Sequence, residues 1–220
     1  MQKHIIKSTK NIIIFGRPGS GKGTICNMLK SDFHLNHLST GDIMRKHIGE
    51  GTKIGIEVSK YISKGKLVPD QIAVDLVLSH WNDEASFLFD GFPRTVEQAE
   101  VLLKTVSIDA VISLDVPHST IIDRISQRWI HAASGRTYAY DFNPPKSLGF
   151  DDLTGEALSQ RADDLAEVVE KRLSEYDEKS SKVIDYLAGS NKTEVVTFTG
   201  TESKVIYPRV KEYLTTHHFS

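Results

Sequence analysis

The stretch Asn11-Ile12-Ile13-Ile14-Phe15-Gly16-Arg17-Pro18-Gly19-Ser20-Gly21-Lys22-Gly23-Thr24 decides the fold of this chain. Its apolar run predicts a buried β-strand, its glycines predict a tight turn, and residues 25–29 read as the start of a helix. Backbone N–H groups of such a turn converge on one point, and the N-terminus of the helix adds partial positive charge there. The stretch therefore predicts a binding site for a polyphosphate.

The residues after the turn have chemically distinct tasks in such a site. Lys22 is placed to reach a β- or γ-phosphate, and Thr24 to offer its hydroxyl to a phosphate-bound Mg²⁺. Gly23 occupies the position directly after the lysine, where a hydroxyl residue is usual. Asp90 follows a second apolar run, residues 87–89, so we expect its carboxylate at the end of a neighbouring strand. There it would hold Mg²⁺ through water, so Mg²⁺ is expected to enter with the polyphosphate, and no direct protein ligand is predicted.

Composition restricts the class of protein. A chain of 220 residues with 39% apolar and 25% charged residues suits one core with small inserted lobes. The net charge of −2 argues against a nucleic-acid partner, and no apolar stretch approaches the roughly 20 residues that span a bilayer. Cys26 is the single cysteine, which excludes an internal disulfide and a cysteine-built zinc site. No large apolar surface stripe is evident, so a monomer is expected.

Strand-like runs alternate with helical segments along the chain. The runs cover residues 11–15, 87–89, 110–116 and 194–198, and the helical segments residues 23–32, 95–105, 118–128 and 164–188. This order predicts an α/β fold with about five mostly parallel strands and helices on both faces. Two segments interrupt it and are expected to be inserted lobes that close over substrate: a first lobe, residues 39–68, and a second lobe, residues 128–164. The core then comprises residues 1–38, 69–127 and 165–220.

Arginines gather near the predicted element ends and in the lobes. Their planar guanidinium groups grip phosphate oxygens and keep their charge at any working pH. Arg124 and Arg128 lie four residues apart in a predicted helix, so both are expected on one helix face. Arg161 precedes Asp163 and Asp164, acids that can orient it. The full set is Arg45, Arg94, Arg124, Arg128, Arg161 and Arg172.

The chain contains four motifs in this order: Gly16 to Thr24, Ser39-Thr40-Gly41-Asp42, Asp90-Gly91-Phe92-Pro93-Arg94, and Arg161 to Asp164. Together they resemble the motifs of the adenylate kinases in their long-lid form, a P-loop NTPase-type fold. The resemblance runs from about residue 11 to residue 214. The first and second lobes would be its NMP-binding lobe and its lid. Further stretches, including Arg128-Trp129-Ile130-His131, Phe142-Asn143-Pro144-Pro145 and Gly200-Thr201-Glu202, look most like the mitochondrial GTP:AMP phosphotransferase branch.

The resemblance implies reversible phosphoryl transfer from GTP, or from ITP or ATP, to AMP, giving GDP and ADP. It implies a location in the mitochondrial matrix, otherwise the cytoplasm; residues 1–10 carry three lysines and no acid but are short for an import signal.

The resemblance also implies residue roles. The residues that act on the transferring phosphoryl group would be Lys22, Arg94, Arg128, Arg161 and Arg172. The donor would be held by Gly19, Ser20, Gly21, Lys22, Gly23, Thr24, Arg128, Tyr138 and Thr201. AMP would be held by Thr40, Arg45, Lys66, Val68, Gly91, Arg94, Gln98, Arg161 and Arg172.

The second lobe contains a spacing that zinc-bearing relatives use. His131, Ser134, Asp151 and Thr154 repeat the pattern C-x-x-C…C-x-x-C with other residue types. Hydroxyl groups are poor zinc ligands, whereas these four side chains can hydrogen-bond together. We therefore predict a hydrogen-bonded lobe without zinc.

Two alternatives stay open. The acceptor could be UMP or CMP, although the long second lobe and the pair Thr40 and Gln98 favour AMP. The chain could instead be a nucleotide-sensing interaction protein with low turnover, although every arginine that an active enzyme needs is present. The donor base is also open, because Thr40 is the residue seen in ATP-using members where the GTP branch often has serine.

Overall fold

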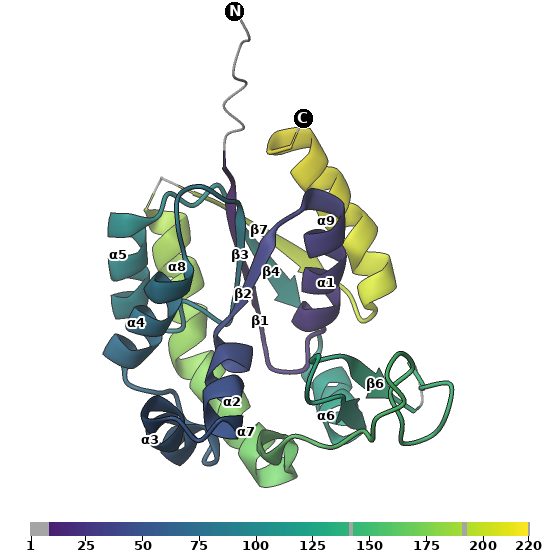
Figure 1. Cartoon of the computed structure of the whole chain (residues 1–220). Helices are drawn as coiled ribbons and strands as arrows, with labels where there is room; N and C mark the ends of the chain where they lie inside the picture. Colours follow the sequence, from purple (N-terminus) through teal and green to yellow (C-terminus); the bar gives the residue numbers. More distant parts are fainter. Residues whose placement is uncertain (1–8, 141–142, 191–192, 220) are drawn as a thin grey trace, which may run out of the picture.

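A central parallel sheet organises the molecule, as Figure 1 shows. The computed structural model describes residues 9–140, 143–190 and 193–219. Residues 1–8 of the lysine-bearing segment 1–10, and Phe142 of the resemblance, lie outside the described residues. The sheet has five strands in the order β2-β3-β1-β4-β7, all parallel. Their bounds are β1 Asn11–Gly16, β2 Asn36–Ser39, β3 Phe87–Asp90, β4 Ala110–Asp115 and β7 Glu194–Thr199. The predicted α/β class and strand number are confirmed.

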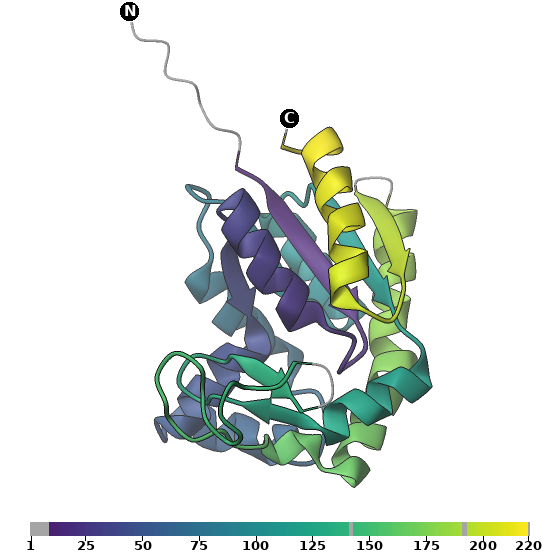
Figure 2. The same ribbon diagram turned by 90° about the vertical axis from the view of Figure 1, so that its right-hand side faces the viewer.

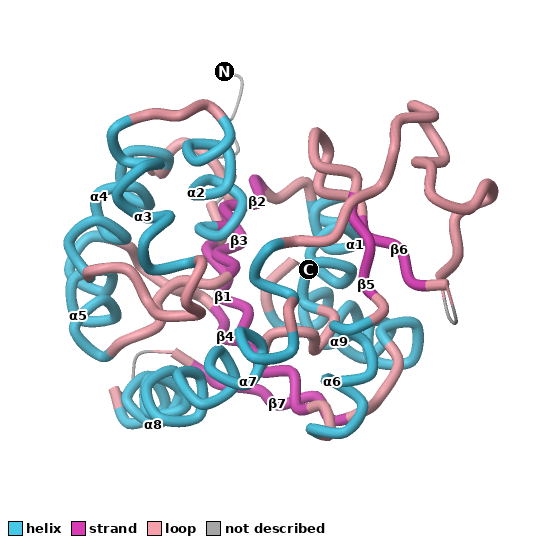
Figure 3. The backbone as a smooth tube through the Cα atoms, turned by 90° about the horizontal axis from the view of Figure 1, so that it is seen from below, coloured by secondary structure: helices cyan, strands magenta, loops and turns pink. Residues whose placement is uncertain are grey.

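The strands are apolar because helices cover both faces of the sheet. Alternate residues of β1 enter opposite halves of the core: Ile12 and Ile14 face one, Ile13 and Phe15 the other. Helices α1 (Lys22–Phe33), α6 (His118–Ser126) and α9 (Ser203–His217) pack on the Ile12 side. Helices α4 (Asp70–His80), α5 (Val96–Thr105) and α8 (Ser181–Gly189) pack on the Ile13 side. Figure 3 shows these two layers on either side of the sheet, viewed from below.

Two segments project beyond the carboxyl ends of the strands. The first lobe contains α2 (Thr40–Gly49) and α3 (Lys53–Ile62). The second contains the antiparallel pair β5 (Arg128–Ile130) and β6 (Thr137–Ala139). Figure 2 shows the second lobe below α1 and in front of the first lobe, and Figure 1 shows the two lobes on opposite sides below the sheet. None of the helices among residues 9–140, 143–190 and 193–219 is both long and apolar enough to cross a bilayer.

The predicted helix 118–128 is wrong at its C-terminal end. Helix α6 stops at Ser126, and the backbone of Arg128 pairs instead with Ala139 in the second lobe. Arg124 and Arg128 therefore do not share a helix face. Their four-residue spacing suggested a shared helix face, but Arg128 lies in the strand pair of the second lobe instead.

The predicted helix 164–188 is also interrupted. It consists of a 3₁₀ turn (Ala162–Asp164), α7 (Ala166–Glu175), a π-helical turn (Tyr176–Ser180) and α8. Leu165 has extended backbone angles, φ −64° and ψ 138°, and separates the first turn from α7. In the π-helical turn, Asp177 accepts from Arg17 Nε at 2.9 Å, and Ser180 Oγ donates to the carbonyl of Arg94 at 3.2 Å. The turn thus joins two loops at the carboxyl edge of the sheet.

Candidate active site

The glycine-rich turn lies between β1 and α1 as predicted. Gly19 (φ +80°) and Gly21 (φ +86°) adopt left-handed backbone conformations that other residues rarely reach. A Cβ on Gly19 would lie 2.6 Å from the side chain of Ile125 in α6, so the close approach of that helix also requires glycine. Helix α1 starts at Lys22 without a side-chain cap, which leaves its first N–H groups available to an anion.

The charge of Lys22 interacts with that of Asp90, the carboxylate at the end of β3. Its Nζ donates to the carbonyl oxygens of Gly16 at 2.5 Å and Arg17 at 2.9 Å. Burial lowers the pKa of Lys22 to about 8, although the charge of Asp90 acts in the opposite direction. For Asp90, burial opposes ionisation, but the hydrogen bond with His37 and the charge of Lys22 outweigh it and lower its pKa. A lysine with a depressed pKa beside a fixed carboxylate is suited to binding a metal–phosphate complex.

Guanidinium groups from four segments converge on the same space. Burial and the neighbouring Arg172 lower the pKa of Arg94 to about 10. Burial and the charges of Arg45 and Arg128 lower the pKa of Arg161 to about 10 as well. The Nε of Arg161 is buried with no hydrogen-bond partner in the described part of the chain. Cations that repel one another and retain an unused donor favour an anion between them.

Carboxylates of the 3₁₀ turn form ion pairs with two of these arginines, Arg172 and Arg128. Arg172 Nη1 lies 2.9 Å from Asp163 and 3.3 Å from Asp164 in the 3₁₀ turn. Arg128 Nε donates to Asp164 at 2.8 Å. The sequence predicted that these acids would orient arginines, and the ion pairs bear this out.

A cavity of about 340 Å³ lies under the turn, between the lobes. It receives side chains from the turn, β3, both lobes and α7. The predicted site residues that line it are Gly19, Gly21, Lys22, Gly23, Thr24, Arg45, Asp90, Gly91, Arg94, Arg128, Tyr138, Arg161 and Arg172. The structure thus brings most of the predicted site into one cavity.

A smaller cavity of about 70 Å³ shares part of this lining and extends into the first lobe. Thr40 Oγ1 donates to the carbonyl of Gly91 at 2.8 Å. Gln98 accepts from the backbone N–H of Arg94 at 2.7 Å and donates to Asp70 at 2.7 Å, so its amide fixes the loop after β3. The predicted AMP ligands lining it are Thr40, Arg45, Lys66, Val68, Gly91, Arg94, Gln98 and Arg172.

Three residues predicted to contact the donor do not simply line a cavity with a free side chain. Thr201 lines neither cavity, and its carbonyl accepts a hydrogen bond from Arg124, which lines the larger one. Ser20 lines neither, and its hydroxyl is buried without a hydrogen-bond partner in the described structure. Tyr138 lines the larger cavity, but its hydroxyl donates to Asp151 at 2.9 Å inside the second lobe.

The second lobe is held by the predicted hydrogen bonds. His131 Nδ1 lies 2.7 Å from Ser134 Oγ, and Thr154 Oγ1 donates to Asp151 at 3.0 Å. Arg136, which the zinc-like spacing did not indicate, donates to both oxygens of Asp151, at 2.7 and 2.6 Å. That bidentate contact holds the pKa of Asp151 well below its usual range. Glu156 completes the network by bonding to His131.

Sequence reasoning missed other residues that line the larger cavity. His37 lies beside Asp90, with 3.3 Å between Nε2 and Oδ2. Asp42 was quoted within a motif, but its pairing with Arg45 at 2.5 Å was not foreseen. Glu175, Tyr176 and Ser203 also line this cavity. The only sequence signal for His37 was its position just before the Ser39-Thr40-Gly41-Asp42 motif.

Comparisons with known proteins agree with this geometry. Residues 14–192 match the family model described as adenylate kinase. The chain is 48% identical over 204 residues to a protein of Drosophila melanogaster named "GTP:AMP phosphotransferase, mitochondrial". The match covers 92% of this chain and 94% of that relative.

Proposed function

This chain belongs to the adenylate kinase family, and on that premise we propose that it transfers a phosphoryl group reversibly from GTP to AMP, giving GDP and ADP. The observation that carries the proposal is the convergence of Lys22, Arg94, Arg161 and Arg172 on one cavity that shares part of its lining with a second, smaller one. Two anionic nucleotides meeting end to end would neutralise cations whose pKa values burial has lowered. Such a transfer needs positioning and charge neutralisation, and no protein nucleophile.

We propose that the donor lies along the glycine-rich turn. The N–H groups of residues 19–24 would bind its phosphates, with Lys22 at the β- and γ-phosphates and Arg128 closing from the second lobe. The ring of Tyr138 would lie near the base, with Thr201 at the margin of the site, and Ser20 would act with the other residues of the turn at the phosphates.

AMP is proposed to occupy the smaller cavity. Thr40, Arg45, Gly91 and Gln98 would lie around its phosphate and base, and the backbone of residues 66–68 would lie beside the adenine. Arg94, Arg161 and Arg172 would then surround the phosphoryl group in transfer, where charge spreads over its three equatorial oxygens. Closure of the first lobe (39–68) and second lobe (128–164) on the core (1–38, 69–127, 165–220) would exclude water that could hydrolyse the donor.

Members of this family use Mg²⁺ with the nucleotide, and the residues present fit that ion. Asp90 lines the cavity as an anion because Lys22 and His37 lower its pKa, and Thr24 lies on the same lining. Carboxylate and hydroxyl oxygens are the ligand types that hydrated Mg²⁺ accepts. Bound there, Mg²⁺ would neutralise charge on the phosphate oxygens.

A location in the mitochondrial matrix is proposed from the mitochondrial name of the relative. A monomer is proposed because one chain contributes residues to both cavities. Neither proposal affects the chemistry.

Product analysis by chromatography tests the activity. The purified chain is incubated with AMP, Mg²⁺ and GTP, ITP or ATP in turn, and then with UMP or CMP in place of AMP. We expect GDP and ADP in equal amounts from GTP and AMP, with little product from UMP or CMP. Faster transfer from ATP than from GTP would make ATP the preferred donor. Tight nucleotide binding without product would favour the low-turnover sensor. Arg94→Ala is the matched control for a contaminating kinase.

A further inference from the structure

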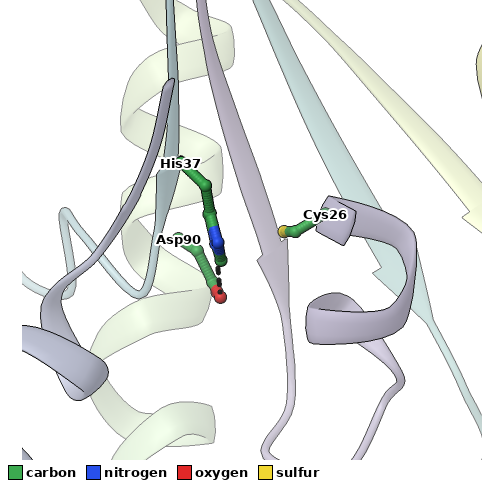
Figure 4. A group of neighbouring side chains, drawn as sticks. All are labelled: Cys26, His37 and Asp90. Atoms are coloured by element: carbon green, nitrogen blue, oxygen red, sulfur yellow. Dashed lines mark hydrogen bonds and ion pairs between the residues drawn. The ribbon is translucent and has the colours of Figure 1, made fainter. Parts of the chain in front are cut away.

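Three side chains with metal-ligating atoms lie together next to the larger cavity, two of them in its lining and one buried behind it. They are Cys26 on α1, His37 on β2 and Asp90 at the end of β3. Their ligand atoms all lie within 4.8 Å of one another. Figure 4 shows His37 and Asp90 side by side, with the sulfur of Cys26 directed toward them.

The spacing suits one tetrahedral ion. Zinc–nitrogen and zinc–oxygen bonds of about 2.0–2.1 Å at a tetrahedral angle put the two ligand atoms about 3.3 Å apart. The distance from His37 Nε2 to Asp90 Oδ2 is 3.3 Å. The sulfur lies within 4.8 Å of the other two ligand atoms. It needs to approach by at most about 1.2 Å, since zinc–sulfur bonds of about 2.3 Å put sulfur roughly 3.6 Å from the other ligands.

The site is also accessible from one side. His37 and Asp90 line the larger cavity, and each side chain is 14% exposed, whereas Cys26 is fully buried behind them. An ion would therefore enter from the cavity and keep a water molecule as its fourth ligand, as three-ligand zinc sites do.

We propose that Cys26, His37 and Asp90 bind a borderline-soft divalent cation such as Zn²⁺, and that its binding stops phosphoryl transfer. The thiol of Cys26 releases its proton to solvent as the metal–sulfur bond forms, so the local charge rises by one. Asp90 then coordinates this ion instead of facing Lys22 and the Mg²⁺ of the donor. Thiolate and imidazole select against Mg²⁺, which prefers oxygen ligands, so Mg²⁺ does not compete strongly. The inhibitory part rests on the proposed function; the binding part does not.

Cadmium, a spectroscopic substitute for zinc, provides the test on the full chain without nucleotide. Cd²⁺ is titrated into the protein while the ultraviolet charge-transfer band of a cadmium–thiolate bond is recorded. Because Cys26 is the only cysteine, a band in the wild-type protein reports on this residue without any variant. We expect saturation at one equivalent, loss of the band in Cys26→Ala and an unchanged band in His217→Gln, a control for exposed histidines near the C-terminus.

Activity is then measured on cadmium-loaded protein after free metal is removed. We expect at least a tenfold loss in wild type, recovery on adding a chelator, and no loss in Cys26→Ala. A wild-type protein without the band would overturn the site. A cadmium-loaded enzyme with full activity would overturn the inhibition. If the metal-free enzyme transfers nothing between GTP and AMP, the proposed function fails while the band still decides the site.

Discussion

Binding of the donor nucleotide should draw a proton onto Lys22. Burial lowers its pKa from 10.5 to about 8 in the free protein, a penalty of about 3 kcal/mol on the charged form. Phosphates beside Nζ favour the charged form and raise the pKa again. A group with a pKa of about 8 is about 10% neutral at pH 7, half neutral at pH 8 and about 90% neutral at pH 9. Proton uptake per bound nucleotide should therefore rise from about 0.1 through 0.5 to 0.9 over this range.

Isothermal titration calorimetry of a non-hydrolysable GTP analogue, in two buffers with different ionisation enthalpies, measures this uptake directly. Lys22→Arg is the matched control, because a guanidinium stays almost fully protonated throughout the range. Arg94 and Arg161, with pKa values of about 10, add only about 0.1 proton each at pH 9. Uptake near zero at pH 8 and 9, or equal uptake in Lys22→Arg, would refute the assignment of Lys22 as the buried phosphate ligand.

Three further results are expected. Arg94→Ala should lower kcat by about 10³ with an unchanged circular dichroism spectrum, since arginines at the transferring phosphoryl group contribute on that scale; near-normal turnover would remove it from the site. Gly91→Ala should raise KM for AMP about tenfold but leave KM for GTP unchanged in initial-rate assays. The new Cβ would lie 2.8 Å from the Arg94 guanidinium and 2.9 Å from Thr40 Oγ1, and the backbone of residue 91 has φ +74°, which alanine rarely adopts. Ile112→Ala, in the fully buried centre of β4, should lower the free energy of unfolding by about 2–5 kcal/mol in urea titrations, whereas exposed Val205→Ala should change it little.

Strand β2 shows why part of the fold escaped prediction. Asn36–Ser39 is only four residues long and lies at the edge of the sheet, so it carries no apolar run of its own. Its extended form comes from pairing with β3 and from the bond between Asn36 N–H and the Ser86 carbonyl. The central strands β1 and β4 were predictable because burial on both faces requires continuous apolar residues.

Only part of the candidate site was predictable from the sequence. Residues of the glycine-rich turn and the loop after β3 were predictable, because each follows a recognisable strand in sequence. The contact between His37 and Asp90 depends on the register of two strands far apart in sequence, in which Ser39 pairs with Asp90. Arg136 belongs to the hydrogen-bond network of the second lobe through a side-chain contact with Asp151, 15 residues away in sequence. No local sequence pattern indicates this contact.

The π-helical turn between α7 and α8 restricts which changes of length this chain can accept. Arg172 precedes it on α7, and Ser180 at its end donates to the backbone of Arg94, so a single turn sets the separation of two guanidinium groups. Removing one residue between positions 172 and 180 would rotate Arg172 by about 100° around the helix axis. Loops at the far end of the sheet can vary in length without this effect, whereas here an insertion or deletion would point one arginine away from its counterpart.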